Sequence, residues 1–301
     1  MPRSCNSMIK PFTRDDLNKL YIPPKTSHKG MNGKLTIIGG SHLFHGASLW
    51  ALKVASRIVD MVFYSSTLEN NELTQKLKSE IYDFIAVPRE KVEEYIEESD
   101  VVLIGPGLSR EEGRVAGEES TKELTERLLK KFPQKKWVID AGSLTEMESK
   151  WLRWLNGNVV ITPHRREFEE LFHVVLSPKG EESRSFPVRY AQGQDDMVQK
   201  IAKDYSCVIL LKGPTDIVCS PSTCVTVEGG NAGMTKGGTG DVLAGLAAAL
   251  ACKNDLFLSA CAASYINKQS GDDLYKRVGP YFNATDLADE IPQVMRKLLL
   301  G

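Results

Sequence analysis

The chain has 301 residues, of which 42% are hydrophobic and 26% are charged, and its formal net charge is −1. This composition is typical of a globular protein with a large core, and the charge balance gives no electrostatic reason to expect nucleic acid or an anionic membrane as a partner. No stretch reaches the ~20 apolar residues of a membrane span, and the N-terminal segment lacks the apolar region of a secretory signal. We therefore expect a cytoplasmic protein without membrane or nucleic-acid partners.

The six cysteines are scattered, and none forms a C-x-x-C pair that would suggest a metal or redox site. Most of them lie in apolar stretches, where a cysteine usually serves as a small core residue. We therefore predict reduced thiols, with neither a disulfide framework nor a zinc site. The cysteines are Cys5, Cys207, Cys219, Cys224, Cys252 and Cys261.

Short β-branched apolar runs alternate with helical patterns from about residue 34 to the end of the chain. Such runs are typical of parallel strands covered by helices on both faces of a sheet, so we predict an α/β fold. The predicted strands lie in KLTIIGG (34–40), MVFYSS (61–66), DVVLIGPG (100–107), KKWVIDAG (135–142), NVVITPH (158–164) and CVILLKG (207–213). Two further runs, DIVCS (216–220) and CVTVEGG (224–230), predict a hairpin at an edge of the sheet.

Five of these strands end in distinctive loops. Glycine, proline and aspartate end many strands, so one such loop means little. In an open α/β sheet, however, ligands bind at the carboxyl ends of the strands, and five such loops in succession indicate a composite site. The loops are Gly39–Ser41, Gly105–Gly107, Asp140–Gly142, Thr162–His164 and Lys212–Pro214.

The segment GGTGD, residues 237–241, directly precedes the helical pattern VLAGLAAALA. The start of a helix presents unpaired N–H groups and a positive dipole end, and glycines allow a ligand to approach them closely. Gly237, Gly238, Thr239 and Gly240 therefore predict an anion hole suited to phosphate. Asp241 is either a favourable neighbour of the helix dipole or a general base beside the hole, and local chemistry leaves both open. The small residues after it are expected to let the helix pack closely on its neighbours.

Two common nucleotide motifs do not fit the sequence. There is no G-x-x-x-x-G-K-[ST] segment, which excludes a P-loop. The first strand ends in Gly39-Gly40, but the next glycine is Gly46, so the dinucleotide fingerprint also fails.

The segment NAGMTKGGTGDVLAG resembles the signature of the ADP- or ATP-dependent NAD(P)H-hydrate dehydratases, members of the ribokinase-like superfamily. The resemblance covers about residues 25–295, and its specificity lies in the order of the motifs, since any one of them is weak. The other motifs are KLTIIGGS, HGASLWALKVA, VLIGPGL, VIDAGSL, VITPHRREFEELF and VILLKGPTDIV. The resemblance implies a ribokinase-like three-layer sandwich with a mostly parallel sheet and no separate lid. It also implies an N-terminal extension (1–24) and a single dehydratase domain (25–301).

The activity that this resemblance implies is the repair of hydrated NADH or NADPH. A nucleotide phosphorylates the hydroxyl added to the nicotinamide ring, and loss of phosphate restores the dihydronicotinamide. Water is a poor leaving group and phosphate a good one, so the chemistry is reasonable. The implied partners are the small-molecule hydrate, ADP or ATP, Mg²⁺ and, as a homo-oligomer, further copies of the chain.

The resemblance also assigns roles to individual residues. Asp241 would be the base, and Glu167 would position magnesium through water. Ala47, Gly105, Gly107, His164 and Asp241 would face the hydrated dinucleotide. Lys212, Gly213, Pro214, Thr215, Asp216, Asn231 and Gly240 would hold the nucleotide.

Simpler roles exist for three of these residues. His164 can cap the helix that follows Pro163, and Lys212 can extend from a strand end toward solvent. Glu167 lies in the charged segment RREFEE and can be merely solvated. Only the order of the motifs favours the functional roles.

Some positions depart from the usual family pattern. Lys236 precedes the anion hole, where many relatives have a small or uncharged residue, and Arg165 and Arg166 follow His164. These cations would either contact phosphate groups or remain solvated. The motifs TPH and GGTGD favour ADP as the nucleotide, whereas SHKG at residues 27–30 is common among ATP users, so we favour ADP.

Two other functions remain open at this stage. A small-molecule kinase of the same superfamily, acting on a vitamin precursor or a sugar, would share Asp241 and the anion hole. The short path from Gly40 to Met61 leaves little room for the lid of a sugar kinase. A non-catalytic nucleotide-binding regulator would keep the loops but not depend on Asp241.

Overall fold

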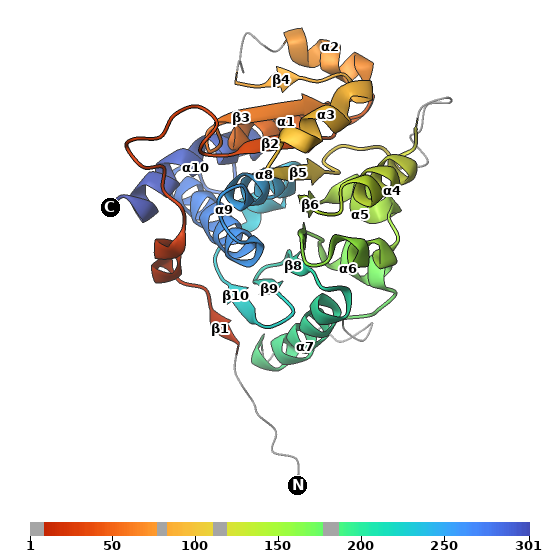
Figure 1. The fold of residues 1–301 in the computed structure, drawn as a ribbon. Coiled ribbons are helices and arrows are strands. Elements are labelled where there is room, and N and C mark those ends of the chain that lie inside the picture. The colour runs from red at the N-terminus through yellow and green to blue at the C-terminus, as the bar shows by residue number, and fades with distance from the viewer. Residues whose placement is uncertain (1–8, 77–82, 111–118, 177–186) are drawn as a thin grey trace.

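The computed structural model describes residues 9–76, 83–110, 119–176 and 187–301, and its ten strands form one sheet (Figure 1). The strands are β1 (Lys10–Pro11), β2 (Lys34–Ile38), β3 (Met61–Ser65), β4 (Ile85–Ala86), β5 (Val101–Ile104), β6 (Lys136–Ile139), β7 (Val159–Ile161), β8 (Val208–Leu211), β9 (Asp216–Cys219) and β10 (Cys224–Val227). The α-helices are α1 (His45–Ala55), α2 (Leu68–Lys76), α3 (Val92–Glu98), α4 (Thr121–Lys131), α5 (Ala141–Glu146), α6 (Arg165–Phe172), α7 (Pro187–Tyr205), α8 (Thr239–Ala251), α9 (Leu256–Val278) and α10 (Ala284–Leu299). Short 3₁₀ helices are η1 (Arg14–Lys19), η3 (Arg89–Lys91), η5 (Ser149–Leu155) and η6 (Ala232–Thr235).

The strand order is β1-β10-β9-β8-β7-β6-β5-β2-β3-β4. All eight predicted strands are confirmed, and among the strands described only β9 runs against the others. The predicted hairpin is β9–β10, and β1 extends the sheet by one further strand beyond it. The strands β1 and β4 have two residues each, too few to show a hydrophobic period in the sequence.

The sheet is buried on both faces, as the continuous apolar runs predict. In β5, Val101 and Leu103 belong to one core cluster, whereas Val102 and Ile104 belong to the other. The first cluster lies under α1, α8, α9 and α10, and the second under α3 to α7 (Figure 1). The arrangement is the predicted three-layer α/β sandwich, and all ten described strands belong to its one sheet.

The helix α8 packs very closely on α1. A Cβ atom at Gly245 would lie only 2.6 Å from the Cα of Ala51, so glycine is required at this crossing. This confirms that the small residues of α8 serve close helix packing. The packing also fixes the position of the α8 N-terminus at the sheet edge.

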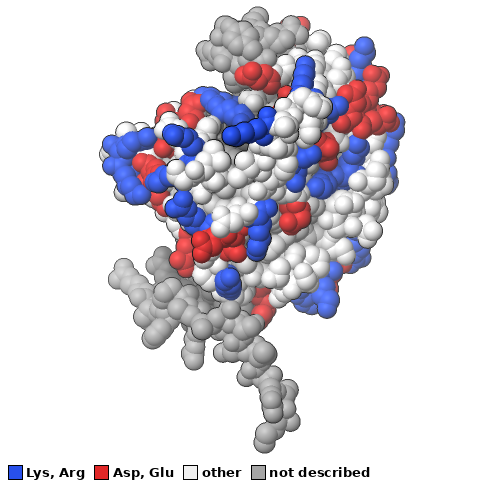
Figure 2. Space-filling view, turned by 60° about the vertical axis from the view of Figure 1, so that its left-hand side comes forward, with Lys and Arg blue, Asp and Glu red and all other residues white. Residues whose placement is uncertain are grey.

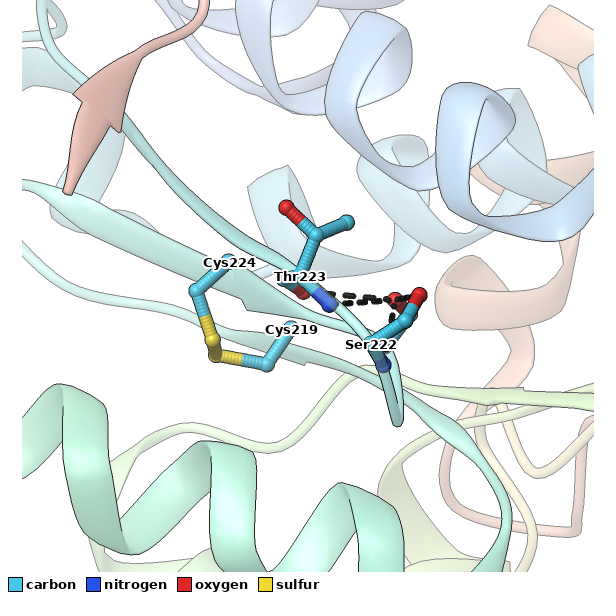
Figure 3. Close-up of a disulfide and its surroundings, with 5 residues drawn as sticks. Cys219, Ser222, Thr223 and Cys224 are labelled. Carbon is cyan, nitrogen blue, oxygen red and sulfur yellow. Dashed lines mark hydrogen bonds between the residues drawn. A yellow bond between two sulfur atoms is a disulfide. The ribbon is translucent and has the colours of Figure 1, made fainter.

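One cysteine prediction is wrong: Cys219 and Cys224 form a disulfide that joins β9 to β10 (Figure 3). Antiparallel pairing places these residues directly opposite each other, with their Cα atoms 4.1 Å apart. The remaining described cysteines, Cys207, Cys252 and Cys261, are buried thiols, and burial raises the pKa of Cys207 to about 12. Cys5 lies outside the described residues.

The segment before β2 packs on the same core as the C-terminal helices. Thr13 and Asp16 form the predicted helix cap, with the Thr13 N–H donating to Asp16 Oδ2 at 3.0 Å. Phe12, Leu17 and Leu20 are buried in the cluster under α8, α9 and α10. These contacts connect residues 10–20 to the sheet.

On the face of the molecule shown in Figure 2, basic and acidic side chains lie next to each other. This mixture agrees with the formal net charge of −1. In the part of the chain that is described, every helix is too short or too polar to cross a bilayer.

Candidate active site

The five loops predicted to form a composite site lie side by side at the carboxyl edge of the sheet. Three backbone hydrogen bonds join neighbouring loops: Gly40 N to Pro106 O at 2.8 Å, Gly142 N to Gly105 O at 3.3 Å, and Lys212 N to Pro163 O at 2.9 Å. The parallel register of β2, β5, β6, β7 and β8 produces this alignment, because it brings all five carboxyl ends to the same edge.

Lys212 lies at the centre of this edge and is bound to a buried carboxylate. Its Nζ is 2.9 Å from Oδ1 of Asp140, which also accepts a hydrogen bond from the Thr162 hydroxyl at 2.8 Å. Burial alone would lower the pKa of Lys212, but the carboxylates of Asp140, Glu167 and Asp241 outweigh it and raise this pKa. Lys212 is therefore a fixed cation and does not simply extend into solvent. The sequence drew attention to the Asp140 loop but not to Asp140 as the partner of Lys212.

Asp241 lies in the first turn of α8 and is partly buried. The preceding turn depends on Gly238, whose φ is 95° and where a Cβ would lie 2.4 Å from the Trp50 ring. Burial and the nearby Asp140 carboxylate raise the pKa of Asp241 to about 7, although Lys212 opposes them. A carboxylate with a pKa near neutrality can accept a proton from a substrate hydroxyl more effectively than an ordinary aspartate.

The residues predicted to form the anion hole differ in their surroundings. Gly237 is exposed, and its Cα faces open space. A Cβ at Gly240 would lie 3.4 Å from Lys212 Nζ, so the start of α8 and this cation share one space. The Thr239 hydroxyl instead bonds within the preceding turn, 2.7 Å from the carbonyl oxygen of Met234. An anion hole at this place would therefore depend on backbone N–H groups and Lys212, and it stays a prediction.

A cavity of about 640 Å³ opens beside Lys212 and Gly240. This volume is in the range of small-molecule sites. The predicted nucleotide residues that line it are Lys212, Gly213, Pro214, Asp216, Asn231 and Gly240. Thr215 is not among the lining residues, whereas His164, predicted to face the dinucleotide, is. A cation and a helix N-terminus at one cavity fit the phosphates of a nucleotide.

Lys268, which the sequence did not single out, joins two loops of this cavity. Its Nζ donates to three backbone carbonyl oxygens, those of Gly213 (3.1 Å), Pro214 (2.9 Å) and Gly229 (3.1 Å). It is also 3.4 Å from Oδ1 of Asp216, and both side chains are 6% exposed. The sequence carries no clear signal for it, because Lys268 lies in the polar segment NKQSGDD of α9, where a lysine is usually exposed.

Asp216 and Asn231 are engaged in internal hydrogen bonds. Asp216 accepts from the Gly213 N–H at 2.8 Å and from the Ser264 hydroxyl at 2.7 Å. The Asn231 amide donates to Asp272 Oδ1 at 3.0 Å. Both residues line the cavity, but their side chains shape its loops.

His164 caps α6, which is the simpler of the two roles expected for this residue. Its Nδ1 accepts from the Glu167 N–H at 3.1 Å, and Glu167 Oε2 accepts from the His164 N–H at 2.8 Å. Glu167 is only 8% exposed, so it is not merely a solvated residue of a charged helix. The exposed half of the His164 ring leaves it free to contribute to the cavity wall as well.

Of the other predicted substrate residues, Ala47 lies in the first turn of α1, and Gly105 and Gly107 follow β5. A Cβ at Gly107 would be 3.1 Å from Ala47 Cβ and 3.2 Å from Gly40 Cα. A Cβ at Gly105 would overlap the carbonyl oxygen of Asp140. Ala47, Gly105 and Gly107 are thus brought together next to the Asp140 loop.

The three unusual cations all have partners within the protein. Lys236 Nζ donates to the carbonyl oxygen of Pro280, and it lies 5.4 Å from the centroid of the Phe282 ring. The side chains of Arg165 and Arg166 form ion pairs with Glu169 and Glu170, at 3.2 and 2.8 Å.

No group of three or more His, Cys, Asp or Glu side chains suited to hold a metal occurs among the described residues. Glu167 is a single carboxylate already bonded to the His164 N–H. In nucleotide enzymes Mg²⁺ usually binds phosphate oxygens and few protein carboxylates. The described residues are therefore compatible with magnesium that is bound mainly through a nucleotide.

Comparison with known sequences identifies the family of the chain. The sequence model of the NAD(P)H-hydrate dehydratase family matches residues 35–293. The ADP-dependent (S)-NAD(P)H-hydrate dehydratase of Nitrosopumilus maritimus is 33% identical over 93% of this chain and 95% of its own length. A bifunctional NAD(P)H-hydrate repair enzyme of Methanocaldococcus jannaschii is 34% identical over 93% of this chain, which spans about half (52%) of that relative.

Comparison with solved structures shows the fold. An ADP/ATP-dependent NAD(P)H-hydrate dehydratase of Bacillus subtilis, crystallised with ATP and Mg²⁺, superposes with a TM-score of 0.76 at 21% identity, over 96% of this chain and 99% of that one. A ribokinase-like superfamily protein of Enterococcus faecalis gives the same TM-score at 23% identity. With a family match over most of its length and a relative above 30% identity covered almost completely, this chain belongs to the NAD(P)H-hydrate dehydratase family.

Proposed function

We propose that the protein restores NADH and NADPH from their hydrated forms in a nucleotide-dependent dehydration. The observation that carries this proposal is Asp241, a carboxylate with a pKa raised to about 7 at the start of α8. Asp241 directly follows Gly240, which lines the 640 Å³ cavity together with Lys212, and its carboxylate interacts electrostatically with Lys212, although Asp241 itself is not among the lining residues. Family membership supplies the identity of the substrate, which geometry alone would not.

In this proposal, Asp241 accepts the proton of the ring hydroxyl and thereby activates its oxygen. Backbone N–H groups at the start of α8, together with Lys212, stabilise the phosphoryl oxygens. A bound nucleotide supplies the phosphoryl group, which turns the hydroxyl into a good leaving group. Asp140 holds Lys212 in place, and Ala47 and Gly107, which lie close together, would contact the dinucleotide.

We further propose ADP as the preferred nucleotide, with Mg²⁺ bound to its phosphates. The support for ADP is the N. maritimus relative, which is named as ADP-dependent. The B. subtilis neighbour, which was crystallised with ATP and Mg²⁺, supports the metal. A cytoplasmic location and a homo-oligomeric state stay predictions, which fractionation and light scattering can check.

A turnover assay tests the function directly. Purified protein is mixed with hydrated NADH or NADPH, with ADP or ATP, and with Mg²⁺, and recovery of the near-ultraviolet absorbance of the reduced nicotinamide is followed. We expect recovery only when nucleotide is present, together with release of free phosphate. No recovery with either nucleotide on either hydrate would refute the proposal, and a stable phosphorylated product would instead indicate a kinase.

A further inference from the structure

A second cavity lies at the far end of the helix that begins at the candidate active site. Its volume is about 260 Å³, slightly below the roughly 300–1,000 Å³ of most small-molecule sites, so it suits a small ligand. Leu250 of α8 lines it, and this residue lies roughly 14 Å along the helix axis from Asp241. Among the described residues, none lines both this cavity and the nucleotide cavity, so the two are separate.

The wall of this second cavity is mainly apolar and comes from segments that are far apart in the sequence. The red segment that follows η1 lies beside the C-terminus of the chain (Figure 1), and both segments line the cavity together with the end of α8. Ile22 and Leu300 in this wall are 47% and 67% exposed although they are large and apolar. Apolar surface that is exposed around a cavity indicates a place for an apolar ligand. The apolar wall includes Leu20, Ile22, Ala249, Leu250, Met295 and Leu299.

Three cations and no carboxylate line the cavity. The cations are Arg57, Lys253 and Arg296, and all three are exposed and thus accessible to a ligand. Arg57 forms an ion pair with Asp289, whereas Lys253 and Arg296 have no carboxylate partner in the part of the chain that the structure describes. The Lys253 ammonium lies 5.5 Å from the centroid of the Tyr21 ring, which belongs to the same wall. The charge of the cavity therefore favours an anion.

Cations near the C-terminal end of a helix can serve the helix itself, because the last carbonyl groups lack partners within the helix. Other cations bind such carbonyls here. Lys136 Nζ donates to the carbonyl oxygen of the last residue of α8 at 3.0 Å, and Arg14 donates to the Lys297 carbonyl oxygen of α10 at 3.0 Å. The side chains of Lys253 and Arg296 make no such bond within the described residues, so they remain available to a ligand.

We propose that this cavity binds a medium-chain fatty acid, with the alkyl chain against the apolar wall and the carboxylate at Lys253 and Arg296. Burial of the chain stabilises such a complex, and lysine and arginine form charge-assisted hydrogen bonds with a carboxylate. A partner helix does not fit, because a single helical turn about 10 Å wide and 5.4 Å long already exceeds the volume of the cavity. The proposal does not depend on the proposed function.

Calorimetry on the whole protein with octanoate, hexanoate and octylamine tests both parts of the ligand. Each buried methylene should tighten binding about fourfold, so octanoate should bind more than tenfold more tightly than hexanoate. Octylamine has the same chain but the opposite charge at neutral pH. It should bind at least about tenfold more weakly than octanoate.

Variants locate the site. Lys253→Met/Arg296→Met should bind octanoate about tenfold more weakly but unfold at the wild-type temperature, because neither side chain has an ion pair to lose. Lys297→Met is the matched control, since Lys297 is the next residue of α10, pairs with Asp273 and does not line the cavity. It should keep the wild-type affinity. Leu299→Trp, a change at a half-buried wall residue, should fill the cavity and abolish binding.

Three results would overturn the inference. Octylamine that binds as tightly as octanoate would contradict the anionic ligand. Octanoate binding that survives in Leu299→Trp and in Lys253→Met/Arg296→Met would place the ligand elsewhere. If octanoate does not bind, the cavity is not a fatty-acid site, and an oligomer that dissociates in Ile22→Ser/Leu300→Ser would then show by light scattering that a second copy covers this face. None of these results affects the proposed dehydration, which is tested by turnover without fatty acid.

Discussion

Lys212 Nζ lies 2.9 Å from Asp140 Oδ1, and the two residues follow strands on either side of β7. Lys212 follows β8, Asp140 follows β6, and Thr162 at the end of the intervening β7 donates to the same carboxylate oxygen. The ends of three neighbouring strands are thereby joined through one buried oxygen. The cation that faces the start of α8 is thus held by the sheet itself.

This pair predicts different effects of mutation on stability and on binding. Lys212→Met leaves the Asp140 carboxylate, 2% exposed, without its cation, and we expect a loss of about 3–5 kcal/mol in the free energy of unfolding. The double variant Lys212→Met/Asp140→Asn should regain most of that loss. Its affinity for ADP should remain low, because the phosphate-binding cation is still missing. Denaturant unfolding and calorimetry check both halves, and recovery of nucleotide affinity in the double variant would argue against a phosphate contact by Lys212.

Asp241→Asn tests the proposed base. The change keeps the shape of the side chain but removes its ability to accept a proton, so kcat should fall by about 10²- to 10⁴-fold. Affinity for ADP should be retained or increased, since a negative charge beside the phosphates has been removed. Turnover assays and calorimetry on the same preparation separate the two effects. Full turnover in Asp241→Asn would mean that another group accepts the proton.

The raised pKa of Asp241 predicts a pH profile. The base must be ionised, so kcat/KM should rise as the pH increases and level off above a midpoint of about 7. Burial is the first cause of this shift, and the Asp140 carboxylate is the second. Asp140→Asn removes the second cause, so the midpoint should move to lower pH. An unchanged midpoint in that variant would contradict the electrostatic coupling between the two residues.

Asp241 should also affect stability in a pH-dependent way. Its pKa in the folded protein is above the ordinary value of 3.8, so folding favours the protonated form. Its contribution is therefore most favourable below about pH 4 and is lost as the pH rises through about 7. Asp241→Asn should accordingly unfold at higher denaturant concentration than the wild type at pH 8, by about 1–4 kcal/mol, with a smaller difference at pH 4.

Lys268→Met should weaken nucleotide binding without touching the reacting groups. The ammonium holds the carbonyls of Gly213, Pro214 and Gly229, so its loss should loosen both loops. We expect a roughly tenfold higher KM for ADP with a much smaller change in kcat, and faster hydrogen exchange in residues 213–215 and 228–231. Lys276→Met is the control, because Lys276 is a surface residue of the same helix with its side chain 72% exposed. Equal effects of the two variants would exclude a specific positioning role.

The sequence was sufficient to predict the elements whose signal is local. The buried strands are continuous β-branched runs, and the loops of the site follow them directly, so the order of strands and loops along the chain already indicates a common edge. The cap formed by Thr13 and Asp16 is local as well. The same reasoning identified the GGTGD segment at the start of α8.

The residues that could not be predicted act over long sequence separations. Lys268 binds carbonyls 39 to 55 residues away. Asp140 and Lys212 are 72 residues apart, so their pairing depends on the adjacency of strand ends. Thr239 was predicted to contact the anion, but its hydroxyl donates to the carbonyl oxygen of Met234.

The prediction of reduced thiols was wrong for Cys219 and Cys224. It followed from the rarity of disulfides in proteins of reducing compartments, whereas the two cysteines face each other across the β9–β10 hairpin.

The Cys219–Cys224 bridge closes a short loop, so chain entropy predicts a stabilisation of only about 2 kcal/mol. Wild-type protein should therefore unfold at lower urea concentration once a reductant is added, whereas Cys219→Ser/Cys224→Ser should respond little. In the register of β9 and β10, Asp216 pairs with Val227 at the end of the hairpin far from the bridge. Affinity for ADP should thus survive reduction, and a wild type whose unfolding ignores the reductant would contradict the stabilising role of the bridge.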